Sequence, residues 1–98
     1  MSKIVSLSAC IALLAPAALS QGAATVSVKD NFFSPKSITV SKGEKVKFVW
    51  RGRNSHNVRG NGASSALMRS GSYSKSFRKS GIVFCSVHDG MTMKVRVK

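Results

Sequence analysis

Residues 45–50 read KVKFVW, and this hexapeptide sets the fold class. Successive side chains of an extended strand point to opposite faces, so Val46, Phe48 and Trp50 share one face while Lys45 and Lys47 share the other. Such alternation is typical of a strand that lies against a core on one face and in water on the other. The neighbouring sequence should therefore supply the other strands of a sheet.

The same period of two recurs through most of the chain. Apolar and polar residues alternate in TVSVKD (25–30), SITV (37–40), YSKSF (73–77) and MKVRV (93–97). No stretch beyond residue 20 keeps a 3.6-residue apolar period long enough for a substantial helix. Turn-forming residues separate the runs, at 34–35, 41–43, 60–62, 70–71 and 80–81. This spacing predicts one all-β domain, a sandwich or barrel of about seven strands, with residues 61–70 as a long loop.

The N-terminus has the features of a secretory signal peptide. Lys3 precedes an apolar run of 11 residues, IVSLSACIALL, and Pro16 follows it. Ala18-Leu19-Ser20 is the best cleavage triplet, and Gly22-Ala23-Ala24 is the second choice. The run is shorter than the roughly 20 apolar residues of a membrane span. We expect residues 1–20 to be removed on export to the periplasm, leaving one domain of residues 21–98 without a membrane insertion.

Cys10 offers an alternative at the same end of the chain. Leu7-Ser8-Ala9-Cys10 resembles a bacterial lipoprotein box, in which the cysteine would carry a lipid anchor. Only the short apolar stretch of residues 4–9 lies before Cys10, whereas a usual signal core has about 7–15 residues, and the apolar run continues past the cysteine. A signal peptide that is simply removed is therefore the favoured interpretation.

The chain is strongly basic, with 16 Lys and Arg against three Asp and Glu and a formal net charge of +13. Such a charge favours acidic protein partners, anionic membrane surfaces or nucleic acid. Nucleic acid fits poorly, because the basic residues are spread along every expected strand, no aromatic platform accompanies them, and the protein is expected to be exported. Arg51, Arg53 and Arg59 flank His56 in sequence. They indicate either a docking rim for an acidic redox partner or solvated faces.

The stretch FCSVHDGM (84–91) spaces a cysteine, a histidine and a methionine three residues apart. Beyond residue 20, Cys85 is the one cysteine, and His56 is the one histidine besides His88. A lone thiol in an exported protein can form an intermolecular disulfide, lie buried and inert, or bind a metal. Two imidazoles, a thiolate and a weak thioether form the set that selects copper for electron transfer, whereas structural zinc sites collect four strong ligands. The inventory therefore favours copper.

The expected strands allow these residues to meet. GIVFC (81–85) is predicted to be a strand ending near Cys85, and another begins near Met93. His56 comes shortly after the strand that ends at Trp50. In a sandwich, both loops can lie at the same end.

Taken together, the sequence resembles the cupredoxin family, the small blue-copper proteins of the plastocyanin, pseudoazurin and amicyanin group. The resemblance lies in FFSPKSITVSKGEKVKFVW (32–50), NSHNV (54–58) and SGIVFCSVHDGM (80–91) followed by KVRV (94–97). It implies a Greek-key β-sandwich and one copper ion held by His56, Cys85 and His88 with an axial methionine. It also implies that Asn57 ties the two ligand loops together and hydrogen-bonds the thiolate.

Two methionines compete for the axial position. Met91 has the short, amicyanin-like spacing from His88, whereas Met93 has the longer, plastocyanin-like spacing and stands where the family commonly has a glycine. Met93 has the strand parity of Val95 and Val97, so it is expected to pack in the core. Met91 is therefore the predicted axial ligand.

The resemblance implies a soluble, monomeric periplasmic electron carrier that cycles between Cu(II) and Cu(I) and is not an enzyme. With two histidines in all, the chain lacks the ligands for the additional metal centres of multicopper oxidases or copper nitrite reductases. The main alternative is a periplasmic copper chaperone or sequestering protein, since the Met91 and Met93 thioethers suit Cu(I). A cupredoxin-like module without metal is a third possibility.

Overall fold

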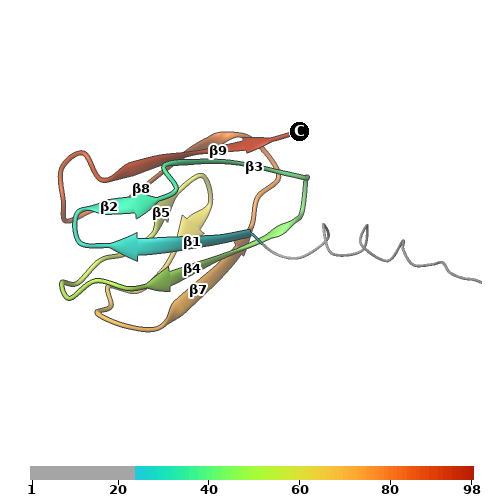
Figure 1. Cartoon of the computed structure of the whole chain (residues 1–98). Helices are drawn as coiled ribbons and strands as arrows, with labels where there is room; N and C mark the ends of the chain where they lie inside the picture. The colour runs from blue at the N-terminus through green and yellow to red at the C-terminus, as the bar shows by residue number, and fades with distance from the viewer. Residues whose placement is uncertain (1–23) are drawn as a thin grey trace, which may run out of the picture.

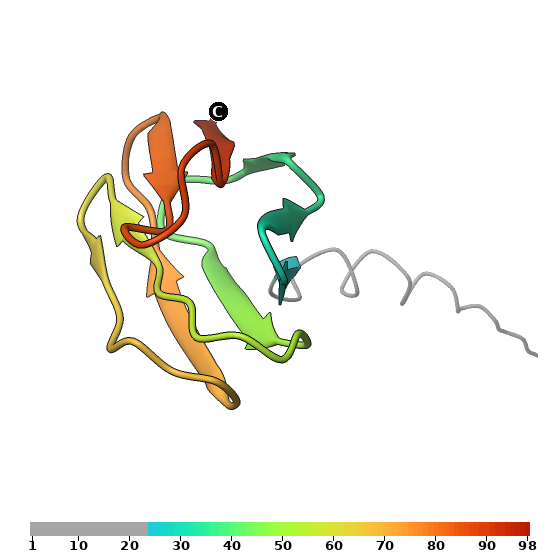
Figure 2. The same cartoon turned by 90° about the vertical axis from the view of Figure 1, so that its left-hand side faces the viewer.

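The computed structural model describes residues 24–98, which form two β-sheets packed face to face (Figures 1 and 2). The four-stranded sheet has the order β2 (Phe32–Ser34), β1 (Ala24–Lys29), β4 (Lys45–Trp50) and β7 (Ser72–Ser76). The five-stranded sheet has the order β3 (Ser37–Val40), β9 (Thr92–Val97), β8 (Gly81–Phe84), β5 (Arg59–Gly60) and β6 (Ala63–Ser64). The predicted signal peptide, including Cys10, lies outside the described residues. Within residues 24–98 no helix is long and apolar enough to cross a membrane.

Strand β4 confirms the alternation of KVKFVW. Val46, Phe48 and Trp50 are buried, whereas Lys45 and Lys47 are exposed. The Phe48 ring lies at the centre of an aromatic group, with the rings of Phe33, Tyr73 and Phe77 at centroid distances of 6.3–6.4 Å. Edge-to-face and offset contacts at such distances add to the stabilisation from apolar burial. All four rings come from the four-stranded sheet or from the residue after its last strand, and they form one part of the core between the sheets.

The pairing of strands brings distant segments to the same end of the sandwich. β1 and β4 are parallel neighbours, with Val28 opposite Trp50, so their carboxyl ends emerge at the same edge. β8 runs antiparallel to β9 and ends beside that strand's beginning, with Phe84 opposite Thr92. The turn after β1, the loop after β4 and the loop between β8 and β9 therefore lie at one end of the molecule, at the left of Figure 1.

The hairpin of β5 and β6 departs from the sequence expectation. Residues 61–70 were expected to be a loop, but Ala63–Ser64 pairs with Arg59–Gly60. Asn61 and Gly62, the two residues of the turn, have φ of 52° and 88°. An Asn-Gly pair with positive φ at both positions is the favoured two-residue turn between antiparallel strands, because its twist matches theirs. This short hairpin and β2 bring the number of strands in the described part of the chain to nine.

Candidate metal centre

His56 lies in the loop after β4, and its backbone is held on both sides. Its N–H donates to the carbonyl of Met68 at 2.8 Å, and its own carbonyl accepts from the Met68 N–H at 3.0 Å. The same carbonyl accepts the indole N–H of Trp50, with Nε1 2.9 Å away. These bonds fix the direction in which the fully buried imidazole leaves the chain.

Cys85 and His88 come from the loop between β8 and β9. The Cys85 N–H donates to the carbonyl of Met91 at 3.0 Å, and the Met91 N–H donates to the carbonyl of His88 at 3.3 Å. Gly90 has φ of 75°, a left-handed conformation that glycine adopts without steric cost. The loop therefore turns back tightly, so that Cys85 is buried and His88 is only partly exposed.

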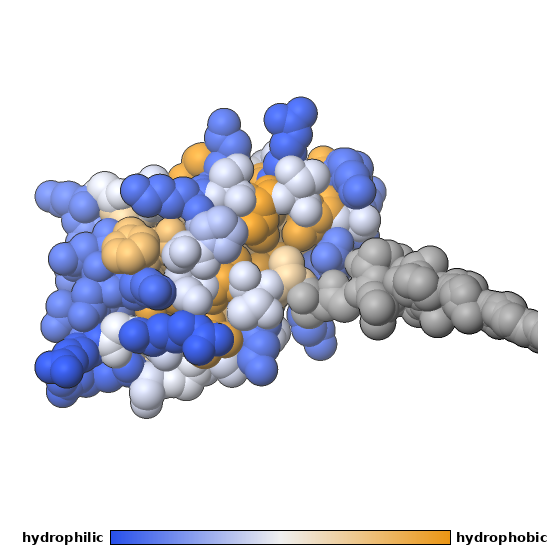
Figure 3. Space-filling model, viewed as in Figure 1, coloured by the Kyte–Doolittle hydropathy of each residue, from blue (hydrophilic) through white to orange (hydrophobic). Residues whose placement is uncertain are grey.

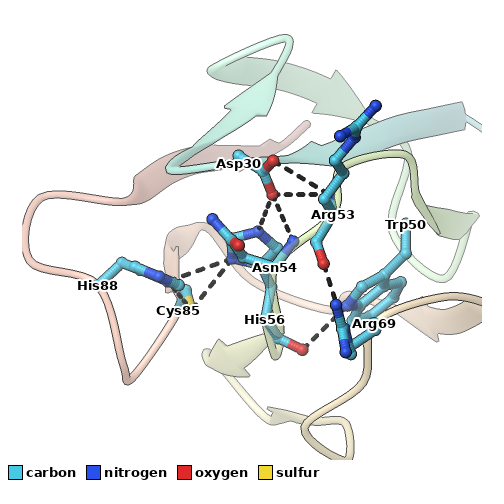
Figure 4. A network of polar contacts seen from close by, with 8 residues as sticks. All are labelled: Asp30, Trp50, Arg53, Asn54, His56, Arg69, Cys85 and His88. Carbon is cyan, nitrogen blue, oxygen red and sulfur yellow. Dashed lines mark hydrogen bonds and ion pairs between the residues drawn. The ribbon is translucent and has the colours of Figure 1, made fainter.

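The three strong donors predicted from the sequence converge (Figure 4). Sγ of Cys85 lies 3.4 Å from Nδ1 of His88 and 3.9 Å from Nδ1 of His56. The two Nδ1 atoms are 3.2 Å apart, and the three donor atoms all lie within 4.8 Å of one another. Donors this close together, two of them on buried residues, have the arrangement of a site that closes around one small ion.

The two methionines occupy different settings. Met91 is buried in the ligand loop and lines a pocket together with Cys85 and His88. Met93 belongs to β9, opposite Val83, and its side chain packs in the core like that of Val95. The geometry thus puts Met91, rather than the strand residue, beside the histidine and the cysteine of its loop.

Asn57 bridges the two loops. Its side-chain amide donates to Oγ of Ser86 at 2.8 Å, and its side-chain carbonyl accepts the backbone N–H of Ser86, also at 2.8 Å. Both bonds go to the residue after Cys85, rather than to the sulfur that the family resemblance suggested as a partner. Because Asn57 follows His56, these bonds set the spacing between the two loops.

The structure adds a carboxylate that the sequence analysis missed. Oδ1 of Asp30, in the turn after β1, lies 3.0 Å from Nε2 of His56. The pKa of Asp30 is lowered from 3.8 to about 2, chiefly by the backbone N–H of Asn54, then by His56 and the backbone N–H of Arg53. Asp30 is therefore ionised at ordinary pH. A separation of 26 residues from His56 leaves no local spacing signal, although Asp30 is one of only three acidic residues in the chain.

The arginines predicted to flank the site are all exposed, and their surroundings differ. Arg51 and Arg53 belong to the loop that carries His56, whereas Arg59 lies in β5 opposite Phe84, the neighbour of Cys85. Arg69, which the sequence analysis did not single out, donates its Nε–H to the carbonyl of Arg53 at 3.2 Å. On the face seen in Figure 3, hydrophilic residues predominate at the left, where this end of the sandwich lies.

The donor set fits copper. Two imidazole nitrogens and one thiolate, with Met91 lining a pocket beside Cys85 and His88, match the trigonal set with a weak fourth ligand that blue-copper sites use. A structural zinc site would need a fourth strong ligand. Within residues 24–98 the clustered donors are His56, Cys85 and His88, with no further histidine, cysteine or carboxylate among them.

A two-sheet sandwich whose end loops bring two histidines and a buried cysteine together defines a cupredoxin. The chain belongs to the plastocyanin/azurin family of copper-binding proteins, whose profile matches residues 21–98. It is a blue-copper protein, and its site holds one copper ion.

Solved structures agree with this assignment. Amicyanin from Paracoccus versutus is 26% identical, with a TM-score of 0.68 over 78% of this chain and 81% of that one. A mutant plastocyanin of fern is 26% identical, with a TM-score of 0.61 over 76% of this chain and all of that one. A copper-containing nitrite reductase from Thermus scotoductus SA-01 shares the fold, with 23% identity and a TM-score of 0.64, but the match covers 78% of this chain and 22% of the enzyme. A comparison with curated proteins gave no match.

Proposed function

We propose that this protein is an exported, soluble electron carrier whose copper is bound by His56, Cys85 and His88, with Met91 as a weak axial ligand. The observation that carries the proposal is the convergence of the three strong donor atoms within 4.8 Å at one end of the sandwich. Copper bound there supplies a one-electron couple between Cu(II) and Cu(I). The family membership supports the same function.

The chain's own contribution is to hold the donors still. The His56 backbone is paired with Met68, the Cys85 N–H is paired with the Met91 carbonyl, and Asn57 links the two loops. A site held by its protein in one geometry rearranges little when the charge of the ion changes. Little rearrangement favours fast electron transfer, which is what a carrier requires.

His88 is the proposed port for electrons. It is partly exposed, whereas His56 is fully buried, and its neighbour Val87 is about half exposed, at 52%. An apolar side chain beside a partly exposed ligand gives a partner protein a surface close to the metal from which water is excluded on docking. Arg51 and Arg53 on the His56 loop, and Arg59 opposite Phe84, form the proposed docking rim, which would attract an acidic redox protein and raise the association rate at low salt.

The small number of metal-binding residues fits an electron carrier rather than an enzyme. The nitrite reductase that shares the fold is a much larger chain, of which this domain corresponds to 22%. With two histidines in the whole sequence, both in one cluster, this chain has none left for a further copper centre of the kind that turns over substrate.

The visible spectrum tests the proposal directly. Metal-free protein beginning at Gln21 should become intensely blue on addition of Cu(II), because a thiolate bound to Cu(II) gives a strong charge-transfer band. Cys85→Ser, which keeps the size of the side chain, should remove the band, and Ser86→Ala, one residue away, should keep it. Retention of Cu(I) without any blue Cu(II) form would overturn the carrier and favour the copper chaperone or sequestering protein.

Export requires its own test. We infer that residues 1–20 direct the chain to the periplasm and are removed there, leaving residues 21–98. Expression of the full sequence in a Gram-negative host should yield periplasmic protein with the mass of the chain from Gln21. A lipid-modified N-terminus at Cys10, detected in the membrane fraction, would contradict this inference.

A further inference from the structure

The least expected feature of the site is the carboxylate behind His56. Nδ1 of His56 faces Cys85 and His88, while Nε2, on the opposite side of the ring, lies 3.0 Å from Oδ1 of Asp30 (Figure 4). The His56 side chain is fully buried, and the Asp30 side chain is 36% exposed. The His56 ring therefore lies between the other two donor residues, Cys85 and His88, and the negative charge of Asp30.

The carboxylate is held in place by the loop that carries His56. Asp30 accepts the backbone N–H of Arg53 on both oxygens, at 2.9 and 3.0 Å, and that of Asn54 on Oδ1 at 2.8 Å. In Figure 4 the guanidinium of Arg53 points away from the carboxylate, so the backbone, not the side chain, binds it. The carboxylate thus has a fixed position and no guanidinium bound to it among the described residues.

Gly52 belongs to the same arrangement. A Cβ at this position would collide with the Asp30 carboxylate and come within 2.7 Å of the Asp30 backbone nitrogen. The close approach follows from the parallel pairing of β1 and β4, which places the turn after one strand beside the loop after the other. The absent side chain at Gly52 therefore makes room for the carboxylate.

The contact decides which nitrogen of His56 carries the hydrogen. An ionised carboxylate only accepts hydrogen bonds, so Nε2 must be the donor. In the neutral ring, Nδ1 then keeps its lone pair, and this lone pair is directed toward Cys85 and His88. A ring that donates to a carboxylate is also a more basic metal ligand.

We propose that Asp30 is a positioning residue for copper, which holds His56 in the Nε2–H tautomer and lowers the reduction potential by strengthening the hold on Cu(II). This inference rests on the proposed ligation of copper by His56. His88 has no hydrogen-bond partner at Nε2 within residues 24–98. The two histidine ligands therefore differ, because only His56 has a carboxylate at its second nitrogen. Asp30 acts against the arginines of the docking rim, whose positive charge favours Cu(I).

The first experiment compares Asp30→Asn with Glu44→Gln in the copper-loaded protein. Both variants remove one negative charge and keep the size of the side chain. Glu44 lies in the turn before β4, at the opposite end of that strand from His56, and a glutamine oxygen there can still accept the Ser41 N–H. We expect Asp30→Asn to weaken Cu(II) binding relative to Cu(I) about tenfold. For a one-electron couple this raises the reduction potential by about 59 mV. Glu44→Gln should leave the potential almost unchanged.

The second experiment needs no copper. Nitrogen NMR of the histidine rings in metal-free protein near pH 8, above the ordinary histidine pKa of about 6.5, reports the tautomer directly. We expect His56 to be Nε2–H in the wild type and to become a mixture of tautomers in Asp30→Asn. A wild-type His56 that is Nδ1–H would overturn the inference, whatever the copper measurements give.

Gly52→Ala provides an independent perturbation, since it keeps the charge of Asp30 but displaces the carboxylate. Like Asp30→Asn, it should raise the reduction potential. If the wild type is blue and both variants have the potential of Glu44→Gln, the positioning role is wrong while the carrier function stands. If the wild type shows no blue band, the proposed function fails, and the NMR result still decides the tautomer.

Discussion

The two histidines of the site differ in how firmly the surrounding protein holds them. His56 is fully buried, its backbone is paired with Met68, and its Nε2, on the ring side away from the other donors, is bound to Asp30. His88 lies on a tight loop, is partly exposed, and has the half-exposed Val87 beside it. The comparison suggests a division of labour, in which one ligand sets the properties of the metal and the other gives access to it. Four pairs of substitutions test this comparison and its surroundings.

Removal of each ring in turn gives the largest expected effect. His56→Gly and His88→Gly should both lose the blue band, because each leaves copper with two strong ligands. Added imidazole should restore the band in His88→Gly at a lower concentration, since its ring position opens toward solvent, whereas the His56 position is enclosed. Titration of both variants with imidazole, followed by the visible spectrum, measures the difference. Equal recovery of the two would erase the distinction between an anchored and an open ligand.

The methionines separate the ligand loop from the strand behind it. Met91→Leu should raise the reduction potential and alter the blue band, because a weak axial donor to Cu(II) is lost. Met93→Leu should change neither, since Met93 packs in the core. Each swap conserves volume and should cost less than about 1.5 kcal/mol of stability. Voltammetry and absorption spectra of the two variants decide the matter, and a shift in Met93→Leu alone would reverse the axial assignment.

Asn57 connects the two loops, so its loss tests how far they are independent. Asn57→Ala leaves the Ser86 N–H without its acceptor and should destabilise the metal-free protein by about 1–3 kcal/mol. Ser86→Ala removes only the hydroxyl partner and should cost less, about 0.5–1.5 kcal/mol. Denaturant unfolding without metal gives both values free of any contribution from bound ion. Equal free energies of unfolding for Asn57→Ala and the wild type would mean that the Asn57–Ser86 hydrogen bonds do not stabilise the metal-free protein.

The arginine rim should give the smallest effect. Arg53→Gln is expected to slow electron transfer with an anionic reagent such as hexacyanoferrate by a factor of about two at low salt, and to speed it slightly with a cationic cobalt complex. Lys98→Gln is the matched control, because it removes the same charge at the end of the chain that follows β9. Stopped-flow rates at two salt concentrations measure both. Identical rates for the two variants would mean that Arg53 acts as an ordinary solvated charge and not as part of a docking rim.

Local patterns predicted much of this molecule. The alternation in KVKFVW and in MKVRV is a property of single strands, and both strands bury the predicted faces. The cluster of His56, Cys85 and His88 followed from donor chemistry and from the expectation that two loops meet at one end. In each of these cases the deciding residues are either close in sequence or few of their kind.

The sequence could not predict contacts that depend on register between distant segments. Asp30 reaches His56 only because Val28 pairs with Trp50 in neighbouring parallel strands, and no spacing within one segment encodes that register. The hairpin of β5 and β6 was missed for another reason. The Asn61-Gly62 turn signal was visible, but strands of two residues are too short to show an alternation.

The bond between Trp50 and the carbonyl of His56 gives the molecule an optical use. Trp50 is the only tryptophan in the chain, it is 6% exposed, and its indole is tied to the residue that carries a ligand ring. Indole fluorescence shifts in colour when the ring becomes hydrated and is quenched by a nearby transition-metal ion. Emission from the unlabelled protein should therefore dim as the site fills and move to longer wavelength as the loop comes apart. A single cuvette measurement thus reads occupancy and integrity as two separate signals.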